Sequence, residues 1–318
     1  METMMLCRHK LAQTTDGREA AVATEVRWSG CVFALATGLS AAALSLSPLQ
    51  TASAAATVKV LYAGSLVNLM EHGVGPAFDK ATGSQFQGYA GGSVGLANQI
   101  KGNLRQGDVF VSASPKVNDS LMGAANGDWV SWYVTFAQSP LVIGYNASSK
   151  FAAEFKTKPW YQVLQEPGIR IGRTAPTLDP KGALTLTLLK QAEAFYNSPG
   201  LSEKITARPS VPEDLEIALL QSGVLDVGFF YSTEIADAKI PALSLPPAIT
   251  PKAIYTVTIL HSAPNPDGAD KFVAFFLGSD GQSLLKEHGL KLQEIHISGD
   301  ASAVPQDIKA IKFDRLED

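Results

Sequence analysis

The sequence predicts an α/β fold in which helices flank mostly parallel sheets. From residue 58 to residue 112, apolar strand patterns alternate with helical patterns, and this order places helices on both faces of a parallel sheet. A second α/β block follows between residues 141 and 231. The composition is that of a globular protein, with 46% hydrophobic and 18% charged residues, which excludes disordered and multi-span membrane classes.

The individual elements follow from local patterns. Strand patterns are short apolar runs, and helix patterns repeat apolar residues every three to four positions. In the long helix predicted over 180–196, the residues Leu184, Leu188, Ala192 and Phe195 form an apolar stripe that we interpret as core. Strands are predicted at 58–63, 84–90, 108–112, 141–145, 169–171, 227–231 and 254–259, and helices at 66–72, 76–82, from Ser93 onward, 180–196, 268–277 and 280–288.

Charge and cysteine content exclude further classes of protein. The 318 residues have a net charge of −4, which gives no electrostatic basis for binding nucleic acid or an anionic membrane. We therefore expect no nucleic-acid partner. The two cysteines, Cys7 and Cys31, are too few for a disulfide scaffold or a cysteine-rich metal cluster, and we expect no cofactor.

The N-terminus has the pattern of a secretory signal peptide. Arg27 precedes an apolar run from residue 31 to about residue 49, and the small residues 51–55 follow it. We predict cleavage after Ala54, so that residues 1–54 are removed. Glycine, serine and proline within the run make it poor for a membrane span, which needs about 20 apolar residues. An exported, periplasmic protein is expected.

Three predicted strand-to-helix junctions carry small polar residues, at Gly64-Ser65, Gly92-Ser93 and Asp179–Gly182. Glycine lets a ligand approach the backbone, and the free N–H groups of a helix N-terminus favour an anion. A serine hydroxyl adds a neutral donor. The junctions therefore predict a site for a small oxyanion. The alternative is that Ser65 and Ser93 are only N-caps of their helices.

Eight short segments follow one another along the mature chain in an order that is specific when they are taken together. They are Tyr62–Leu66, Gly91–Val94, Gly107–Ala113, Trp132–Ala137, Trp160–Gln165, Leu178–Gly182, Leu219–Asp226 and Phe230–Tyr231. In this order they resemble the molybdate/tungstate-binding proteins of ABC importers. The resemblance is greatest to the subgroup that holds the metal with additional carboxylate ligands.

This resemblance implies a two-lobed periplasmic-binding-protein fold of type II, with two sheets and a hinge that the chain crosses twice. Lobe one would comprise residues 57–136 and 238–318, and lobe two would comprise residues 137–237. The implied ligand is molybdate or tungstate, held between the lobes. The implied protein is a monomer that docks on an ABC transporter permease and is not an enzyme.

The resemblance also implies a set of site residues. Ser65 and Ser93 from lobe one would face Asp179, Glu213 and Tyr231 from lobe two. The hydroxyl groups would contact the oxyanion, and the two carboxylates would bind the molybdenum or tungsten atom itself. Such an atom can expand from four to six oxygen ligands, whereas the sulfur of sulfate cannot, so the carboxylates would provide selectivity.

Local patterns leave alternatives open for these residues. Asp179 precedes Pro180 as an N-cap does, and Ser210-x-x-Glu213 has the form of a capping box. Tyr231 is equally consistent with a half-buried core tyrosine.

The residue after Asp-Pro departs from the subgroup. The subgroup shows Cys-Gly-Tyr-Arg at this point, whereas Lys181-Gly182-Ala183-Leu184 stands here. Lys181 is a candidate for neutralising the carboxylates or contacting the oxyanion, and the alternative is that it points to solvent.

Two rival functions fit parts of the sequence. Gly91–Gly95 satisfies the Gly-x-Ser-x-Gly pattern of serine hydrolases, with Asp226 and either His261 or His288 as partners of Ser93. Ser93 comes too early in the chain for the several strands that precede a hydrolase nucleophile.

The second rival is a binding protein of the same fold for sulfate, phosphate or an organic acid. Recognition of an organic carboxylate calls for a positioned arginine that can make a bidentate pair. Arg173 is the candidate, and its alternative is a surface arginine at the end of a strand.

Overall fold

The computed structural model describes residues 56–313. The predicted signal peptide at 1–54 therefore lies outside the described residues. In the described part of the chain, no helix is both long enough and apolar enough to cross a membrane.

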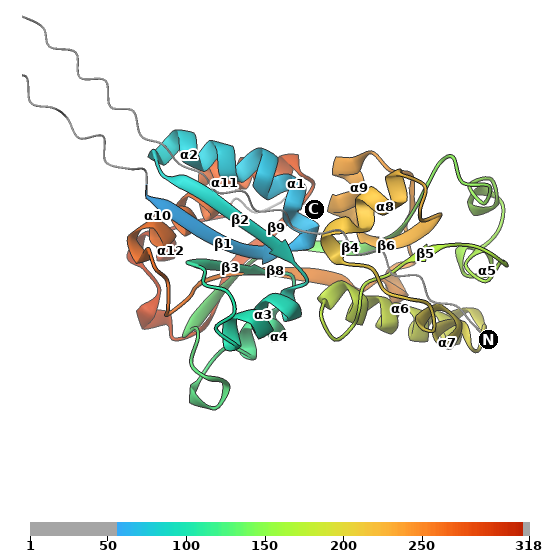
Figure 1. Cartoon of the computed structure of the whole chain (residues 1–318), viewed down its shortest axis with the longest axis horizontal. Coiled ribbons are helices and arrows are strands. Elements are labelled where there is room, and N and C mark those ends of the chain that lie inside the picture. Colours follow the sequence, from blue (N-terminus) through green and yellow to red (C-terminus); the bar gives the residue numbers. More distant parts are fainter. Residues whose placement is uncertain (1–55, 314–318) are drawn as a thin grey trace, which may run out of the picture. The chain divides into compact units, whose positions relative to one another are not determined.

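A β-sheet forms the centre of the structure (Figure 1). Its strands are β1 (Thr57–Ala63), β2 (Gln85–Gly91), β3 (Val109–Ser112), β4 (Trp132–Tyr145), β5 (Ile171–Gly172), β6 (Val227–Tyr231), β7 (Ala242–Leu243), β8 (Lys252–Ile259) and β9 (Lys291–Gly299). The main path has the order β2-β1-β3-β8-β4-β6-β5, and β7 and β9 also pair with β4. All seven predicted strands are present, and β7 and β9 were not predicted.

Strand direction differs from the prediction of mostly parallel sheets. Parallel pairing joins β1 to β2 and β3, and it joins β5 to β6. The pairings that involve β4 or β8 are all antiparallel. The strand-helix alternation that predicts parallel neighbours holds for β1 to β3 and again for β5 and β6. The strands β4 and β8 run opposite to their neighbours, and β9 is also antiparallel to β4.

The long strand β4 changes partners along its length. Residues up to Pro140 pair with β8 and β9, whereas residues from Leu141 to Tyr145 pair with β6 and β7. The chain from β7 to β8 runs back alongside β4 in the opposite direction. On this path the Pro251 carbonyl accepts a hydrogen bond from the Leu141 N–H at 2.9 Å. The sequence predicted only the second half of this strand.

The predicted helices are confirmed, and the region 66–82 forms one nearly continuous helical run. Asp179 caps α6, and left-handed Asn197 ends it, as its position after the helix pattern predicts. The helices are α1 (Val67–Leu69), α2 (Gly75–Thr82), α3 (Ser93–Lys101), α4 (Pro115–Asp119), α5 (Trp160–Val163), α6 (Pro180–Tyr196), α7 (Leu201–Thr206), α8 (Glu216–Gln221), α9 (Ser232–Ala238), α10 (Pro266–Leu277), α11 (Ser279–Glu287) and α12 (Gln306–Lys309), with short 3-10 or π segments at η1 (Gly64–Leu66), η2 (Met70–Val74), η3 (Ala124–Asn126), η4 (Glu154–Lys156), η5 (Glu213–Leu215), η6 (Pro247–Ile249) and η7 (Ala301–Ala303).

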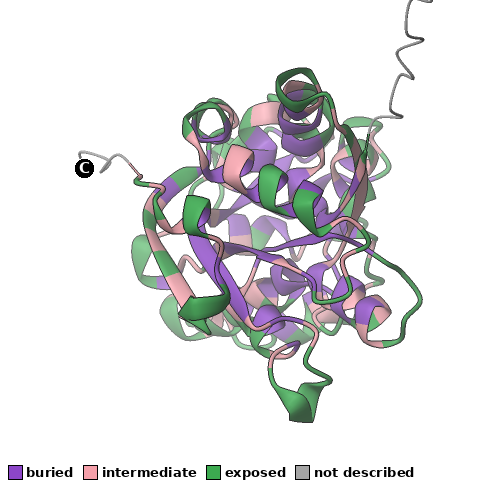
Figure 2. Ribbon diagram, turned by 90° about the vertical axis from the view of Figure 1, so that its left-hand side faces the viewer, coloured by how far each residue is buried: buried purple, intermediate pink, exposed green. Residues whose placement is uncertain are grey.

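The central strands of the sheet are buried, β2 and β9 are partly exposed, and the helices around the sheet expose their outer faces (Figure 2). The α6 stripe was predicted only in part. Leu188 and Ala192 are fully buried, but Phe195 is 52% exposed. The inward face of α6 instead begins with Lys181 and Thr185, because the lysine finds buried acidic partners and so turns a charged position toward the interior.

Candidate functional site

Two helix N-termini lie side by side at one edge of the sheet. β1 and β2 are parallel, and Ala63 pairs with Gly91, so both strands end at the same level. Helical segments begin directly after them, η1 at Gly64 and α3 at Ser93. The local sequence explains this placement, since glycine and serine follow each strand at the point where the backbone turns. Free N–H groups therefore gather at one place, which suits an anion.

The two serines are not N-caps, so that interpretation was wrong. The N-cap residues are Ala63 for η1 and Gly92 for α3, and neither helix start has a side-chain cap. Ser93 is fully buried, and its Oγ accepts a hydrogen bond from the Ala113 N–H at 3.1 Å. Its hydroxyl proton is left to donate elsewhere.

Ser65 pairs with a tyrosine that the sequence analysis missed. Its Oγ lies 3.1 Å from the Tyr255 hydroxyl on β8, and either oxygen can be the donor. The Tyr255 ring also packs edge-on to the Tyr231 ring, with centroids 6.1 Å apart. Nothing in the alternating strand pattern of β8 distinguishes Tyr255 from a core tyrosine, so no local signal could have found it.

Asp179 caps α6, as its position before Pro180 predicts, but the cap uses only half of the carboxylate. Its Oδ1 accepts from the Lys181 N–H at 3.1 Å, and its Oδ2 is buried without a hydrogen-bond partner. The residue lies against the start of α3, since a Cβ atom added to Gly92 would come within 3.0 Å of the Asp179 Cβ.

Glu213 does not form a capping box. The N-cap of η5 is Pro212, without a side-chain cap. Instead the Glu213 Oε2 accepts a hydrogen bond from the Gly64 N–H at 2.9 Å, across 149 positions of sequence, and its Oε1 is buried without a partner. The carboxylate thus occupies one of the N–H groups at the start of η1.

Tyr231 ends β6 and is fully buried, and its hydroxyl has no hydrogen-bond partner. Asp179, Glu213 and Tyr231 therefore each carry an orphaned buried oxygen. Such an oxygen costs about 1–3 kcal/mol when left unsatisfied. These three oxygens, at the N-cap of α6, in η5 and at the end of β6, are candidates for contacting a polar ligand.

Lys181 is the counter-ion of this region. Its side chain is 1% exposed, and its Nζ lies 2.9 Å from Glu216 Oε2 and 2.9 Å from Glu234 Oε1. The solvent-exposed alternative was therefore wrong. The ion pairs join α6 to α8 and α9, and neither glutamate was singled out from the sequence.

Burial governs the protonation of the site. It raises the pKa of the Asp179 carboxyl, although the Lys181 charge opposes the rise. Burial, with the Asp179 charge, also raises the pKa of Glu213 well above its ordinary value. Burial likewise raises the pKa of Tyr231, which stays a neutral donor. The site thus disfavours two bare carboxylates, and it favours a proton or an electrophilic centre beside them.

A cleft of about 520 Å³ adjoins these residues. One wall comes from η1, α1 and η2 and includes Ser65, and the other comes from η5, α8 and α9 and includes Glu213 and Glu234. The predicted site residues Ser65 and Glu213 therefore line this cleft, whereas the buried residues Ser93, Asp179, Lys181 and Tyr231 do not.

The geometry has counterparts among known proteins. A model of the bacterial extracellular solute-binding protein family matches residues 58–291, which is most of the chain. The chain belongs to this family. The resemblance seen in the sequence is thereby confirmed at the level of the family.

Some relatives of this solute-binding protein carry more specific names than the family does. A solute-binding protein of Petrotoga mobilis is 28% identical over 253 residues, covering 66% of this chain and 77% of the relative. The molybdate/tungstate-binding protein of Thermococcus kodakarensis is 23% identical over 296 residues, covering 75% of this chain and 83% of the relative. The solved periplasmic molybdate-binding protein of Azotobacter vinelandii has a TM-score of 0.61 and 23% identity, and the match covers 74% of this chain and 100% of that chain, which shows a shared two-lobed fold.

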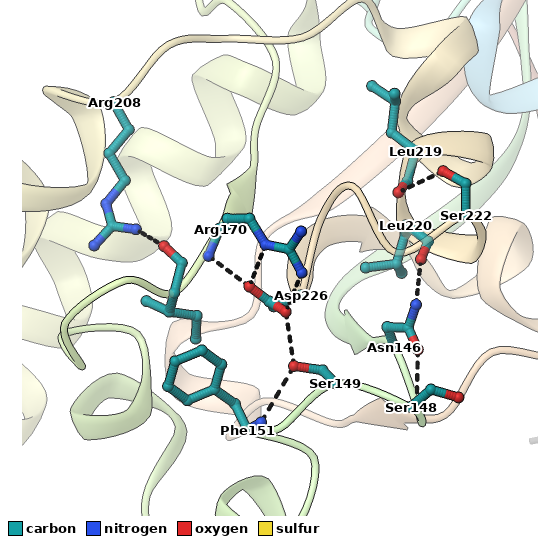
Figure 3. Close-up of polar contacts among 11 residues, drawn as sticks. Asn146, Ser148, Ser149, Phe151, Arg170, Arg208, Leu219, Leu220, Ser222 and Asp226 are labelled. Carbon is teal, nitrogen blue, oxygen red and sulfur yellow. Dashed lines mark hydrogen bonds and ion pairs between the residues drawn. The ribbon is translucent and has the colours of Figure 1, made fainter.

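The residues of the rival hydrolase are engaged in separate contacts in this solute-binding protein. Asp226 forms a bidentate pair with Arg170 and accepts from Ser149 (Figure 3). His261 Nδ1 contacts the Asp128 carbonyl oxygen, and His288 Nδ1 contacts Asp237. None of these contacts involves Ser93, so the geometry does not support a catalytic triad.

Arg173, the candidate for binding an organic carboxylate, is directed elsewhere. Its guanidinium donates to the carbonyl oxygens of Thr206, at 2.6 Å, and Arg208. It therefore secures the segment after α7 instead of offering a free fork to a ligand.

Proposed function

We propose that this protein is the substrate-binding component of an ABC importer and captures molybdate or tungstate between two lobes. Lobe one would consist of residues 57–136 and 238–318, and lobe two of residues 137–237. The names of the relatives support this ligand class. The observation that carries the proposal is the set of orphaned buried oxygens on Asp179, Glu213 and Tyr231, beside the N-termini of η1 and α3.

In this proposal, neutral groups bind the oxygen atoms of the ligand. Ser65 and Ser93 supply hydroxyl donors, the start of each helix supplies N–H groups, and the Tyr231 phenol donates from the opposite side. Such donors stabilise a dehydrated oxyanion without adding a full counter-charge to the site. Lys181 contributes at longer range, because its ammonium is already paired with Glu216 and Glu234.

The two carboxylates provide selectivity. Asp179 Oδ2 and Glu213 Oε1 are buried and make no well-formed hydrogen bond, although the Thr174 hydroxyl lies near Asp179. Both oxygens can therefore become fifth and sixth ligands of molybdenum or tungsten. Beside sulfate or phosphate the same oxygens would repel the ligand, because neither sulfur nor phosphorus accepts further ligands in this way.

The work of the protein would be capture without catalysis. Closure of the lobes buries the ion, and the closed form is the one that a permease can recognise. Export through the predicted signal peptide, with cleavage near Ala54, would deliver a monomer to the periplasm.

Ligand-dependent thermal stability tests the proposal. The purified protein, freed of ligand by dialysis, is melted with molybdate, tungstate, sulfate, phosphate or citrate at constant ionic strength. A ligand at 1,000 times its Kd adds about 4 kcal/mol to the free energy of unfolding, which is an easily visible shift of Tm. Shifts with molybdate and tungstate alone are expected. A shift with sulfate, phosphate or citrate instead would replace the ligand class, and no shift with any of them would contradict the proposal.

A further inference from the structure

The backbone at Gly92 meets the backbone at Leu178 with no room between them. A Cβ atom added to Gly92 would lie 2.6 Å from the Leu178 carbonyl oxygen and 3.2 Å from its carbonyl carbon. Contacts below 3.0 Å essentially never occur for real Cβ atoms, and backbone atoms cannot rotate away as a side chain can. A side chain at position 92 is therefore incompatible with this approach.

The same carbonyl is held by a hydrogen bond from one turn further along α3. The Gly95 N–H donates to the Leu178 oxygen at 2.9 Å. The Leu178 side chain is 51% exposed, so its burial does not hold the segment in place. The contact is thus made by main-chain atoms, and it brings Asp179 against the start of α3.

From this contact we infer that Gly92 is a positioning residue for ligand capture, which permits the 178–179 segment of lobe two to close on α3 of lobe one. This inference rests on the proposed function. We call the contact among Gly92, Gly95 and Leu178 the backbone latch. In the closed form, the latch sets the depth to which the Asp179 carboxylate enters the site.

The bare backbone at position 92 is not required by local conformation. Gly92 has φ −59° and ψ 128°, values that any residue adopts readily. Its lack of a side chain therefore serves the approach of Leu178 and not a special turn. A Gly92→Ala protein should fold normally and fail mainly in closing.

The latch also predicts which rate constant changes. The ligand enters the open form, in which the two segments are apart, so association should be unaffected by a methyl group at position 92. Dissociation requires opening of the closed form, which the methyl group strains. Overpacking of a tight contact corresponds to a loss of affinity of about ten- to a hundredfold. We expect this loss to arise from a faster dissociation rate.

The test compares alanine substitutions on one helix, with molybdate as the probe. Gly92→Ala should raise the Kd by about ten- to a hundredfold through faster dissociation, followed by stopped-flow fluorescence, with an unchanged Tm of the ligand-free protein. Gly95→Ala keeps the N–H and puts its methyl group 3.8 Å from the same oxygen, so its effect should be at least about fivefold smaller. The exposed Asn98→Ala serves as the unchanged control.

Gly64→Ala is a second variant in case Gly92→Ala does not fold. Its added Cβ would lie 2.9 Å from Glu213 Oε2 and 3.1 Å from the Asp214 nitrogen, so it hinders the approach of η5 to the end of β1, which is a second contact between the same two lobes. Faster dissociation is expected here too.

The outcomes separate the inference from the function on which it rests. If the wild-type protein binds molybdate but Gly92→Ala releases it no faster than Gly95→Ala does, the backbone latch is overturned and the proposed function stands. Slower association with unchanged dissociation in Gly92→Ala overturns the latch as well. Wild-type protein that binds neither molybdate nor tungstate overturns both.

Discussion

The two sides of the candidate site differ in how they treat charge. On the side of β1 and β2, Ser65, Ser93 and the helix N-termini present neutral donors. On the side of α6, η5, α8 and α9, one buried lysine stands among four buried acidic residues, Asp179, Glu213, Glu216 and Glu234. The proposed anion site therefore has its formal negative charges on one wall and most of its neutral donors on the other, with the Tyr231 phenol as the neutral donor on the charged side.

The difference shows that the two walls offset the cost of burying polar groups in different ways, because each wall uses the groups that its own elements supply. The neutral wall uses backbone N–H groups that a helix start leaves free in any case. The charged wall stays buried only because Lys181 offsets Glu216 and Glu234, and because raised pKa values lower the charge on Asp179 and Glu213. The charged wall should therefore be the more sensitive one to substitution and to pH.

The largest effect is expected from removing Lys181, the buried cation that pairs with Glu216 and Glu234 in the charged wall. Lys181→Met leaves Glu216 and Glu234 buried without their partner, and breaking such a pair costs about 3–5 kcal/mol. Urea unfolding at pH 7 measures the loss. Lys190→Met, at an exposed position of the same helix, should change stability by less than about 0.5 kcal/mol. Equal losses for the two variants would contradict the role of the ion pairs.

The second effect concerns pH and the stability of the ligand-free protein. Burial raises the pKa of Glu216 from 4.5 to about 7. The folded state holds this proton more tightly than the unfolded chain, so the contribution is fully present below pH 4.5 and is lost as the pH rises to about 7. It amounts to at most about 3 kcal/mol. Unfolding free energies measured across this range should fall less steeply in Glu216→Gln, and parallel curves for both proteins would count against the shift.

The third effect separates the carboxylates from the neutral donors. Glu213→Gln and Asp179→Asn keep an oxygen that can accept from the Gly64 and Lys181 N–H groups, but they remove the charge that we propose to bind molybdenum or tungsten. We expect molybdate affinity to fall by about a hundredfold or more, measured by calorimetry, and X-ray absorption to report fewer oxygen ligands. Glu203→Gln, at an exposed position on α7, is the matched control. Unchanged affinity in both amide variants would leave a four-coordinate ion held by neutral donors.

The smallest effect is expected on the neutral wall. Tyr255→Phe removes the hydroxyl that lies 3.1 Å from Ser65 Oγ, and one neutral hydrogen bond contributes about 1 kcal/mol, or about fivefold in Kd. Tyr161→Phe on α5 removes the same kind of hydroxyl away from the site, so it is the control and should leave the Kd unchanged. A loss as large as that of Glu213→Gln would mean that the two walls do not differ as described.

Local sequence was sufficient for seven of the strands and for the helices over 66–82, from Ser93 onward, and over 180–196, 268–277 and 280–288. These elements follow from apolar periodicity and from residues that begin or end a helix, which are signals within a few neighbouring positions. The shorter helices α4, α5, α7, α8, α9 and α12 were not predicted, and the roles of Ser65 and Ser93 in a site stay a prediction. The cap at Asp179 is equally local. The pairing of strands that are far apart in the sequence was not visible, and this is why the antiparallel placement of β8 and β9 and the length of β4 differed from the prediction.

Only the tertiary structure decided the charged wall. The Glu213 carboxylate meets the Gly64 N–H across 149 positions, and Lys181 finds Glu234 across 53. Lys181 lies near a helix start, and Glu213 lies three positions after a serine, so their local sequences are typical of a surface residue and of a capping residue. Helix and capping propensities depend only on residues that are near in sequence, and they carry no information about partners from other elements. Their burial depends on partners brought by other elements, since a charge leaves water only where an opposite charge or a set of donors already awaits it.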